Sequence, residues 1–478
     1  MMKFRVLLSL AFVVYESAAY PFGSHYPLPE GQVSQTFTDN FNPVKNFGGN
    51  GPYSDGRGFG ISRDPPEGCS VDQVIMLHRH GERYPDVGVY QTIEKAINKL
   101  TAFEANNTLE GDLDFFSEWD FWIHNSALIA QETTTGPYAG LLDGYSQGTE
   151  YAARYKNLWD GKTKVPMFSS GYQRIIETAR KFGEGFFGRN YSEIVDMNII
   201  PEDAAQGANS LTPSCHALKT SNVCGNLTHI MPEFSVAAER SNKQNPGLTL
   251  NSTDVYALMI TAAYELNANP YSPWIDVFTR EEWISFGYTQ DLIYYYCDGP
   301  GDAASVAAGS LYANATLTLM NQGPEKAGKL YFSFCHDVNI TPVLAAIGLF
   351  TPKEDLPVDR LPFTYDYHSG DFVPMGGHLV FERMTCNQTA NNEKGVYVRA
   401  VVNEAVIPFE ECSSGPGFSC SLSNYTTYLN SKLKDFNAVC KTPSSYPQEL
   451  TFFWNYNDTN QYDYQNGPVS YQLGLTNE

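Results

Sequence analysis

Three segments of the chain repeat one pattern: a short apolar run, then a polar turn, then residues with helical periodicity. The runs are VIMLH, VPMFSSG and KLYFSF, and they begin at residues 74, 165 and 329. Each run has the length of a buried strand. Strands that alternate with helices are typical of a mostly parallel sheet with helices on its faces. The pattern therefore predicts a doubly wound α/β fold.

Each apolar run ends in a turn that carries charged side chains. The first turn is RHGERYP, residues 79–85, and the third is CHDVN, residues 335–339. The second leads into the segment YQRIIETARKFGEGFF, where Ile175 and Phe182 share one helical face and Arg174 lies in the first turn. Ligands bind at the carboxyl ends of the strands in such sheets. We therefore expect the three turns to form a single site.

The chain as a whole is acidic, with a formal net charge of -22. Such a charge repels polyanions and excludes nucleic acid as the expected partner. Any anion site must then be a local pocket of cations. The turn RHGERYP is such a concentration, because two arginines and a histidine lie within five residues.

Four side chains of the three turns are suited to phosphate. Arg79, Arg83 and Arg174 supply planar, permanently charged groups that match a dianionic phosphate, and the helix starts behind them add N–H groups. We expect His336 to donate a further hydrogen bond to the same phosphate. An isolated Arg-His-Gly occurs by chance, but its combination with Arg174 and the His336–Asp337 pair favours a functional site.

His80 and Asp337 are the expected catalytic residues. The arginines around His80 should lower its pKa and keep one ring nitrogen neutral and nucleophilic. Asp337 supplies a carboxyl group that can protonate a leaving alkoxide, and for this role it must begin protonated. Because each role has a side chain, we predict that the reaction needs no cofactor and no metal. We expect His78 and His378 to be structural.

The first residues have the features of an export signal. Lys3 and Arg5 precede the apolar run LLSLAFVV, and Ser17 and Ala19 supply small residues at a cleavage site. The apolar run is too short to span a bilayer. The sequence therefore predicts a secreted protein that is not anchored in a membrane.

Glycosylation sites and cysteines agree with export. The chain holds nine Asn-X-Ser/Thr sequons, at Asn106, Asn190, Asn226, Asn251, Asn314, Asn339, Asn387, Asn424 and Asn457. Its nine cysteines contain no CxxC pair, which favours disulfides in an oxidising compartment over a zinc or redox motif. Because the count is odd, one thiol is left over.

The length of 478 residues exceeds what one core usually holds, so we expect two domains. Segments such as DVYALMITAAYELN and TQDLIYYYC indicate a helical domain inserted between sheet elements. The predicted division is a signal peptide over 1–19, an extended arm over 20–60, a helical cap over 191–324, and an α/β domain over 61–190 and 325–478.

Five motifs resemble one known family. ISRDPPEGC followed by RHGERYP, then FCHDVNI, then VVNEAVIP with ECSSGPGFSC, are similar to the histidine acid phosphatases, particularly secreted yeast acid phosphatases and fungal phytases. The resemblance runs from about Gly51 to the tail. It implies a phosphohistidine at His80, proton donation by Asp337 and a phosphoglycerate-mutase-like α/β domain with a helical cap. The phosphate contacts that it implies come from Arg79, Arg83, Arg174 and His336.

The resemblance also implies a disulfide framework. It pairs Cys69 with Cys386, Cys215 with Cys440, and Cys412 with Cys420. A bond between Cys224 and Cys297 then follows by elimination, and Cys335 is left over. Relatives usually have a small residue at the position of Cys335, so we weigh a reactive thiol near the site against a buried thiol that acts as a small apolar side chain. We favour the second interpretation.

The predicted function is a secreted acid phosphatase or phytase, which hydrolyses phytate and other small phosphomonoesters through a phosphohistidine at acidic pH. The alternative is a broad-specificity acid phosphatase with little phytate activity, because the segment PDVGVYQTIEKAINKL is only sparsely basic where similar phytases place lysines. A mutase is the rival within enzymes, and a catalytically inactive cell-wall or anion-binding glycoprotein is the rival from a different class. We expect no nucleic-acid or membrane partner, and the sequence leaves the oligomeric state open, a homo-oligomer included.

Overall fold

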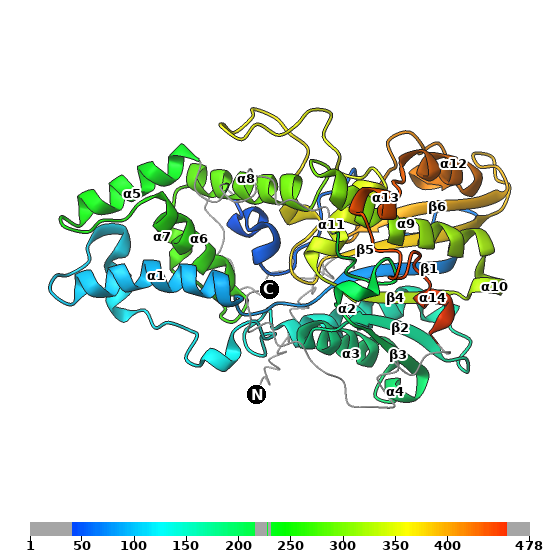
Figure 1. Ribbon diagram of the computed structural model, residues 1–478, viewed down its shortest axis with the longest axis horizontal. Helices are drawn as coiled ribbons and strands as arrows, with labels where there is room; N and C mark the ends of the chain where they lie inside the picture. The colour runs from blue at the N-terminus through cyan, green and yellow to red at the C-terminus, as the bar shows by residue number, and fades with distance from the viewer. Residues whose placement is uncertain (1–40, 216–226, 228–230, 457–478) are drawn as a thin grey trace, which may run out of the picture.

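A computed structural model describes residues 41–215, 227 and 231–456 (Figure 1). The predicted signal peptide therefore lies outside the described residues. So do Cys224 and the sequons at Asn226 and Asn457.

The centre of the structure is one sheet of eight strands, in the order β3-β2-β4-β1-β5-β6-β7, with β8 beside β6. The neighbours β3, β2, β4 and β1 are parallel, and the remaining pairs are antiparallel. This confirms the α/β class, but the sheet is not mostly parallel as expected, because the strands from β5 onward pair antiparallel. The strands are β1 (Cys69–Arg79), β2 (Val165–Ser170), β3 (Val195–Ile200), β4 (Leu330–Cys335), β5 (His378–Cys386), β6 (Gly395–Val402), β7 (Ala405–Ile407) and β8 (Cys420–Ser421).

Strand β1 is central because its residues are apolar on both faces. Val74 and Met76 belong to one buried cluster, and Ile75 and Leu77 belong to another. Helix α3 (Gln173–Phe187) packs in the first cluster through the face predicted from its periodicity, which is fully buried. Helix α2 (Gly140–Tyr155) packs against α3, and α3 in turn packs against β2 and β4.

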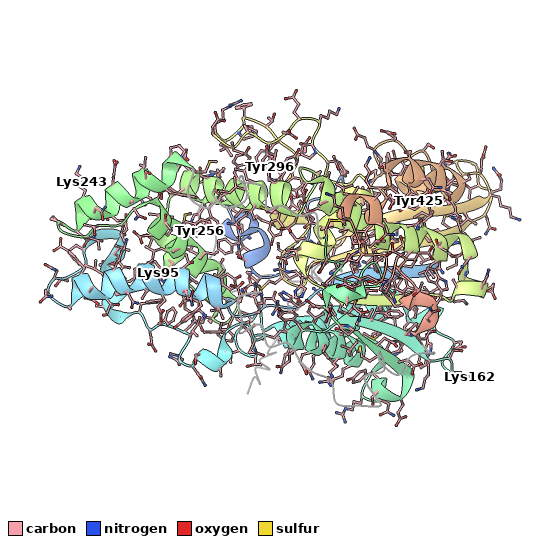
Figure 2. The ribbon with its side chains drawn as sticks, viewed as in Figure 1. Lys95, Lys162, Lys243, Tyr256, Tyr296 and Tyr425 are labelled. Carbon is pink, nitrogen blue, oxygen red and sulfur yellow. A yellow bond between two sulfur atoms is a disulfide. The ribbon has the colours of Figure 1, made fainter. Side chains whose placement is uncertain are left out.

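A lobe of helices lies beside the sheet, on the left in Figure 1. It contains α1 (Val87–Glu104), α5 (Pro232–Gln244), α6 (Ser252–Leu266), α7 (Trp274–Val277) and α8 (Arg280–Cys297). Tyr256 in α6 and Tyr425, on the sheet side, are both buried and mark the interiors of the two halves (Figure 2).

Two elements correct the predicted boundary of this helical region. Strand β3 lies within 191–324 but pairs with β2 in the sheet. Helix α1 lies outside that range but packs against α6. Helical periodicity reveals an apolar face without saying which neighbour covers it, so the sequence placed α1 with the sheet.

The segment expected to be an extended arm folds against the protein where it is described. Residues 43–50 form the short helices η2 (Pro43–Asn46) and η3 (Gly48–Asn50). Phe47 between them is fully buried, with its ring 5.3 Å from that of Trp283 on α8. An aromatic anchor therefore outweighs the glycine-rich composition that suggested an extended chain.

Other helices complete the structure around the sheet. Helix α9 (Ala303–Gln322) packs against α11 (Asp337–Ala346). The remaining α-helices are α4 (Tyr191–Ile194), α10 (Pro324–Ala327), α12 (Leu422–Lys432), α13 (Phe436–Cys440) and α14 (Phe452–Asn455). Further short helices are η4 (Gly111–Glu118), η5 (Ser126–Leu128), η6 (Lys156–Leu158), η7 (Ala204–Gln206), η9 (Ser369–Asp371) and η10 (Pro416–Phe418).

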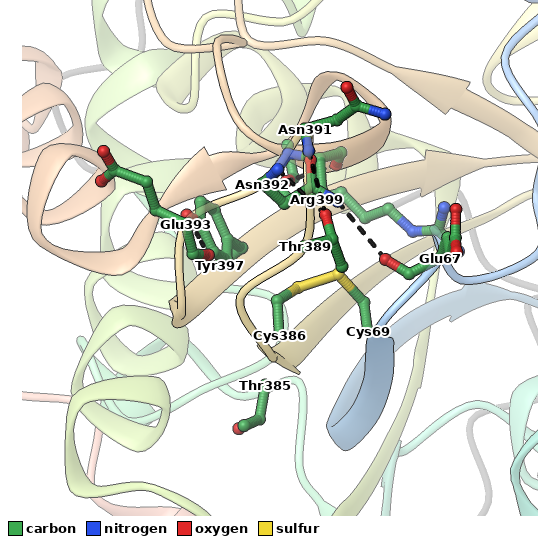
Figure 3. The surroundings of a disulfide bond; sticks show 12 residues. Glu67, Cys69, Thr385, Cys386, Thr389, Asn391, Asn392, Glu393, Tyr397 and Arg399 are labelled. Carbon is green, nitrogen blue, oxygen red and sulfur yellow. Dashed lines mark hydrogen bonds between the residues drawn. A yellow bond between two sulfur atoms is a disulfide. The ribbon is translucent and has the colours of Figure 1, made fainter.

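Three of the disulfides implied by the family resemblance are present. Cys69 and Cys386 face each other on β1 and β5 and are bonded, and the nearby loop is tied back by Asn392, whose amide donates to the carbonyl of Glu67 at 3.3 Å (Figure 3). The other two confirmed bonds are Cys215–Cys440 and Cys412–Cys420.

Candidate active site

The sheet topology brings the three predicted turns to one edge. Strand β4 lies between β1 and β2, and Arg79 on β1 is paired in register with Cys335 on β4. The turn after β1, the turn after β4 and the start of α3 after β2 therefore lie side by side. All six residues selected from the sequence lie in this group.

His80 has a defined tautomer in this site. Its side chain is buried, and Nδ1 lies 2.7 Å from the carbonyl oxygen of Gly81. A carbonyl only accepts, so Nδ1 carries the proton and Nε2 keeps its lone pair. Burial, and then the charges of three nearby arginines, hold the pKa of His80 well below its usual value. Both effects favour the neutral form of the imidazole, in the direction expected from the sequence.

Arg79 is held in place by three acceptors. Its Nη1 donates to the carbonyl of Gly49 at 2.7 Å and to that of Val373 at 2.6 Å. Its Nη2 lies 2.8 Å from Oδ2 of Asp337. The N-terminal segment and the loop before β5 thus orient this guanidinium, and neither contact was visible in the sequence.

Arg83 and Arg174 complete a concentration of buried positive charge. Arg83 donates to the carbonyl of Tyr84 at 2.9 Å and lies over the ring of Tyr264. Arg174 lies over the ring of Tyr172 at 4.6 Å, and burial and then the charge of Arg83 lower its pKa to about 10. Like charges are packed together at a cost, which a bound dianion would offset.

Each arginine of this group has one buried donor that is unpaired among the described residues. The Nε atoms of Arg79, Arg83 and Arg174 are buried and have no hydrogen-bond partner within the described part of the chain. Buried polar groups are nearly always hydrogen-bonded in folded proteins. The charges of these three arginines act together on His80, so an anion bound beside the imidazole would be stabilised by all of them.

His336 is placed in the group, but both of its ring nitrogens are occupied. Nδ1 lies 3.3 Å from Nη2 of Arg174, and Nε2 lies 2.9 Å from Oε1 of Glu202. Although burial favours the protonated form of Glu202, His336 holds the pKa of this carboxyl below its usual range. The predicted phosphate contact from His336 therefore requires exchange of one of these partners, and it stays a prediction.

Asp337 differs from the expectation in its protonation state. Oδ2 accepts hydrogen bonds from Arg79 and, at 2.5 Å, from the hydroxyl of Tyr294 on α8. Burial alone would raise the pKa of Asp337, but Arg79 and then Tyr294 outweigh it and hold the pKa at about 2. The carboxyl is therefore ionised before any ligand binds, and the expectation that it begins protonated is wrong for this state.

The glycine of the first turn is required by close packing. A Cβ at Gly81 would lie 2.5 Å from the carbonyl oxygen of Gly140 in α2. The amide of Gly81 donates to Oγ1 of Thr178 at 2.9 Å and to Oε1 of Glu132 at 3.2 Å. Burial raises the pKa of Glu132 to about 8, so this carboxyl is neutral in acid and leaves the positive field of the site intact.

The residues assigned a structural role are buried behind the site. His78 and His378 are fully buried, with their rings stacked 5.1 Å apart, and Nε2 of His378 lies 3.0 Å from Glu404. Cys335 is also fully buried and has no disulfide partner. Burial raises the pKa of its thiol well above the usual value, which favours the small apolar role over the reactive one.

Sequence reasoning missed the residues that orient the site. Glu202 follows the end of β3, so its position after a strand was the available signal, but the strand itself was assigned to the cap. For Gly49, Val373 and Tyr294 no local signal exists, because each reaches the site from a separate part of the chain.

Comparison with known proteins places this site in a family. Residues 70–403 match the model of the histidine phosphatase superfamily, branch 2. The chain belongs to this superfamily. The segment matched contains the strand-end turns of this histidine phosphatase, with His80 in the first of them. The family and the fold predicted from the motifs are thereby confirmed.

Two relatives and one solved structure show how far the similarity extends. The histidine phosphatase is 36% identical to a phytase of Candida albicans, over 88% of this chain and 92% of that protein. It is 34% identical to the constitutive acid phosphatase of Saccharomyces cerevisiae, over 87% and 90%. Its fold matches the crystal structure of the phytase from D. castellii with a TM-score of 0.84 and 33% identity, over 95% and 96% of the two chains.

The sequon at Asn339 differs from the others in its surroundings. The six other sequon asparagines among the described residues are exposed, whereas Asn339 is half-buried. Its Oδ1 accepts from the backbone of His336 at 3.3 Å, and it lines a cavity of about 190 Å³ with Val338 and Asp298. We expect Asn339 to carry no glycan in the active enzyme. Glycopeptide mapping checks this, and high occupancy at Asn339 would contradict the placement of the turn.

Proposed function

We propose that the chain is a secreted acid phosphatase that hydrolyses phosphate monoesters, phytate among them, through a phosphohistidine at His80. The observation that carries this proposal is the buried imidazole of His80, whose pKa is lowered by burial and then by the charges of the three arginines around it. The names of the relatives, phytase and acid phosphatase, support the same reaction class.

In the proposed first step, Nε2 of His80 attacks phosphorus in line with the ester oxygen. A nitrogen–phosphorus bond forms as the phosphorus–oxygen bond breaks. Arg79, Arg83 and Arg174 stabilise the charge on the three remaining phosphate oxygens. Asp337 gives a proton to the departing alkoxide, which leaves as an alcohol.

The ionised state of Asp337 implies that its proton arrives with the substrate. The second pKa of a phosphate monoester is about 6, so the substrate is a monoanion in acid. A monoanion with an ionised Asp337 contains the same number of protons as a dianion with a protonated Asp337. Because the bound phosphate neutralises the arginines that lower the pKa of Asp337, the proton passes to the carboxyl on binding. Acid pH is then needed to supply the monoanion.

In the proposed second step, water replaces the histidine at phosphorus. The Asp337 carboxylate takes a proton from the attacking water, the nitrogen–phosphorus bond breaks, and the electron pair returns to Nε2 of His80. Inorganic phosphate leaves. The Nδ1 proton, held by the carbonyl of Gly81, stays on the ring throughout.

The helical lobe contributes to the site, so we propose that it acts as the cap predicted from the sequence. Tyr294 of α8 contacts Asp337, and the ring of Tyr264 of α6 lies under Arg83. Export of the chain is also a proposal, supported by three disulfides and by the exposed sequons. No helix within the described ranges is long and apolar enough to cross a bilayer.

Phytate as the preferred substrate has weaker support than phosphomonoesters in general. Lys99 of α1 is bound to Asp254 at 2.6 Å, and Lys95, one turn earlier, lies on the outer surface of the helical lobe (Figure 2). This observation favours the alternative, a broad-specificity acid phosphatase.

We expect the purified protein to release phosphate from both phytate and an aryl phosphate. With so few cations after the first turn, kcat/KM for phytate should exceed that for the aryl phosphate by less than about tenfold, the gain from one surface ion pair or two. Parallel assays at one acidic pH measure the ratio. A much larger preference for phytate would show a dedicated polyphosphate site, and absence of phosphate release from either compound would overturn the proposed function.

A further inference from the structure

The hydroxyl of Tyr294 connects the helical lobe to Asp337. Tyr294 is buried on α8, and its hydroxyl lies 2.5 Å from Oδ2 of Asp337. Arg79 donates to the same oxygen at 2.8 Å, and the amide of Val338 donates to Oδ1 at 3.0 Å. Among the described residues the carboxylate thus has three donors. Arg79 is charged, and Val338 is the next residue of the chain, so Tyr294 is the neutral donor that comes from the helical lobe.

Gly49 in the N-terminal segment leaves room for the Tyr294 hydroxyl because it has no side chain. A Cβ at Gly49 would lie 1.8 Å from the hydroxyl oxygen of Tyr294 and 3.1 Å from Oδ2 of Asp337. Next to it, the amide of Asn50 donates to Gln290, one helical turn before Tyr294, at 2.8 Å. The contact is therefore fixed by η3 on one side and by α8 on the other.

The charges around Asp337 show what the contact does. Arg79, Arg83 and His336 favour the ionised carboxylate, as does the hydrogen bond from Tyr294. Asp298 also faces this carboxylate: burial and then the charge of Asp337 raise the pKa of Asp298 to about 7, so Asp298 is neutral in acid and adds no competing negative charge. Burial and then Asp337 raise the pKa of Tyr294 well above its usual value, so the phenol keeps its proton and donates.

We propose that Tyr294 is a positioning residue, whose hydroxyl orients the Asp337 carboxyl in both steps of the reaction and stabilises the carboxylate that the second step uses as its base. The role rests on the proposed function of Asp337 as acid and base. When a phosphate binds and competes for Arg79, Tyr294 remains as a neutral donor to the same oxygen. It keeps the carboxyl in place while the proton is gained and then lost, and so sets the lower limit of the working pH range.

The change Tyr294→Phe should raise the pKa of Asp337 by about one to two units, because a hydrogen bond to a charged group is removed and the ring shape is kept. The pH profile follows with a definite sign. The reaction needs one proton in total on Asp337 and the substrate. At pH values below the pKa of Asp337 both groups are protonated, so kcat/KM decreases there. The acid limb therefore moves up by one to two units, and the alkaline limb, set by the substrate, stays.

Two measurements test this, with Tyr295→Phe as matched control. Tyr295 is the next residue of α8, and its hydroxyl makes a similar bond, 2.6 Å long, to Asp355 outside the site. Titration of carboxyl-labelled aspartate by ¹³C NMR, with Asp337→Asn to assign the signal, gives the pKa directly. The pH dependence of kcat/KM for an alkyl phosphate gives the acid limb. We expect both to shift in Tyr294→Phe and neither to shift in Tyr295→Phe.

The double variant Tyr294→Phe/Asp337→Asn decides whether Tyr294 acts through Asp337. We expect Tyr294→Phe to have no effect on turnover or on the pH profile in the Asp337→Asn background. A similar loss in both backgrounds, or an unchanged Asp337 titration, would overturn the proposal. If Asp337→Asn itself leaves turnover of the alkyl phosphate intact, the acid role of Asp337 fails, and the NMR titration still decides whether Tyr294 controls the carboxyl.

Discussion

Replacing His80 with alanine should abolish turnover and leave phosphate binding nearly intact. The variant loses the nucleophile, and loss of a nucleophile costs on the order of 10⁵ to 10⁶-fold in kcat. The arginines that face the phosphate keep their own supports, since Arg79 is held by Gly49 and Val373 and Arg174 by Tyr172. Steady-state assay on an aryl phosphate measures the loss, and calorimetry measures the binding of inorganic phosphate.

The covalent intermediate can be trapped in parallel. Wild-type enzyme mixed with a labelled phosphomonoester and quenched in acid, then brought to alkaline pH for analysis, should contain phosphohistidine at His80, and His80→Ala should contain none. His124→Ala is the matched control, because His124 is an exposed histidine and its loss should leave both rate and labelling unchanged. Substantial turnover by His80→Ala, together with an unlabelled wild type, would rule out the phosphohistidine mechanism.

Replacing Asp337 with asparagine should slow poor leaving groups far more than good ones. Asparagine keeps the shape of the side chain but carries no proton to give, so alkyl phosphates and phytate should slow by roughly 100 to 10,000-fold, the range of general acid catalysis. An aryl phosphate should lose less, because a nitrophenolate departs without a proton. For this substrate the attack of water lacks its base, and the phosphohistidine should accumulate.

A series of esters with leaving groups of graded basicity measures this difference, under conditions where phosphorylation limits the rate. Asp355→Asn is a suitable control, because Asp355 accepts a hydrogen bond from Tyr295 outside the site and should behave like wild type. If Asp337→Asn slowed every ester by the same factor, Asp337 would only shape the pocket, and the acid would have to be another group.

The protonation of Asp337 shows where reasoning from sequence reached its limit in the site. The pattern of residues identified a carboxyl beside three arginines, and this is correct. Its pKa of about 2 depends on the distances to Arg79 and to Tyr294, which is 43 residues away in the chain. No local pattern encodes such a distance, so the ionised state of Asp337 became visible only in the folded protein.

The fold also has features that the sequence predicts and features that it does not. Apolar runs of strand length and the helical face of α3 are local features, and from them the strand–turn–helix units and the positions of His80, Arg174 and Asp337 followed. Pairing is not local: a strand such as β3 has the same composition in a sheet as it would have in a cap, and the apolar face of α1 fits a helix as well as a sheet.

The groups proposed to be catalytic were readable from the chain because each lies directly after a strand, and parallel strands bring their ends to one edge. Their supports were not readable, because Gly49, Glu202, Tyr294 and Val373 reach the site from four separate segments. Side-chain chemistry and strand order thus specify the reaction class. The packing of distant segments against one another sets the orientation and the charge of the groups that carry it out.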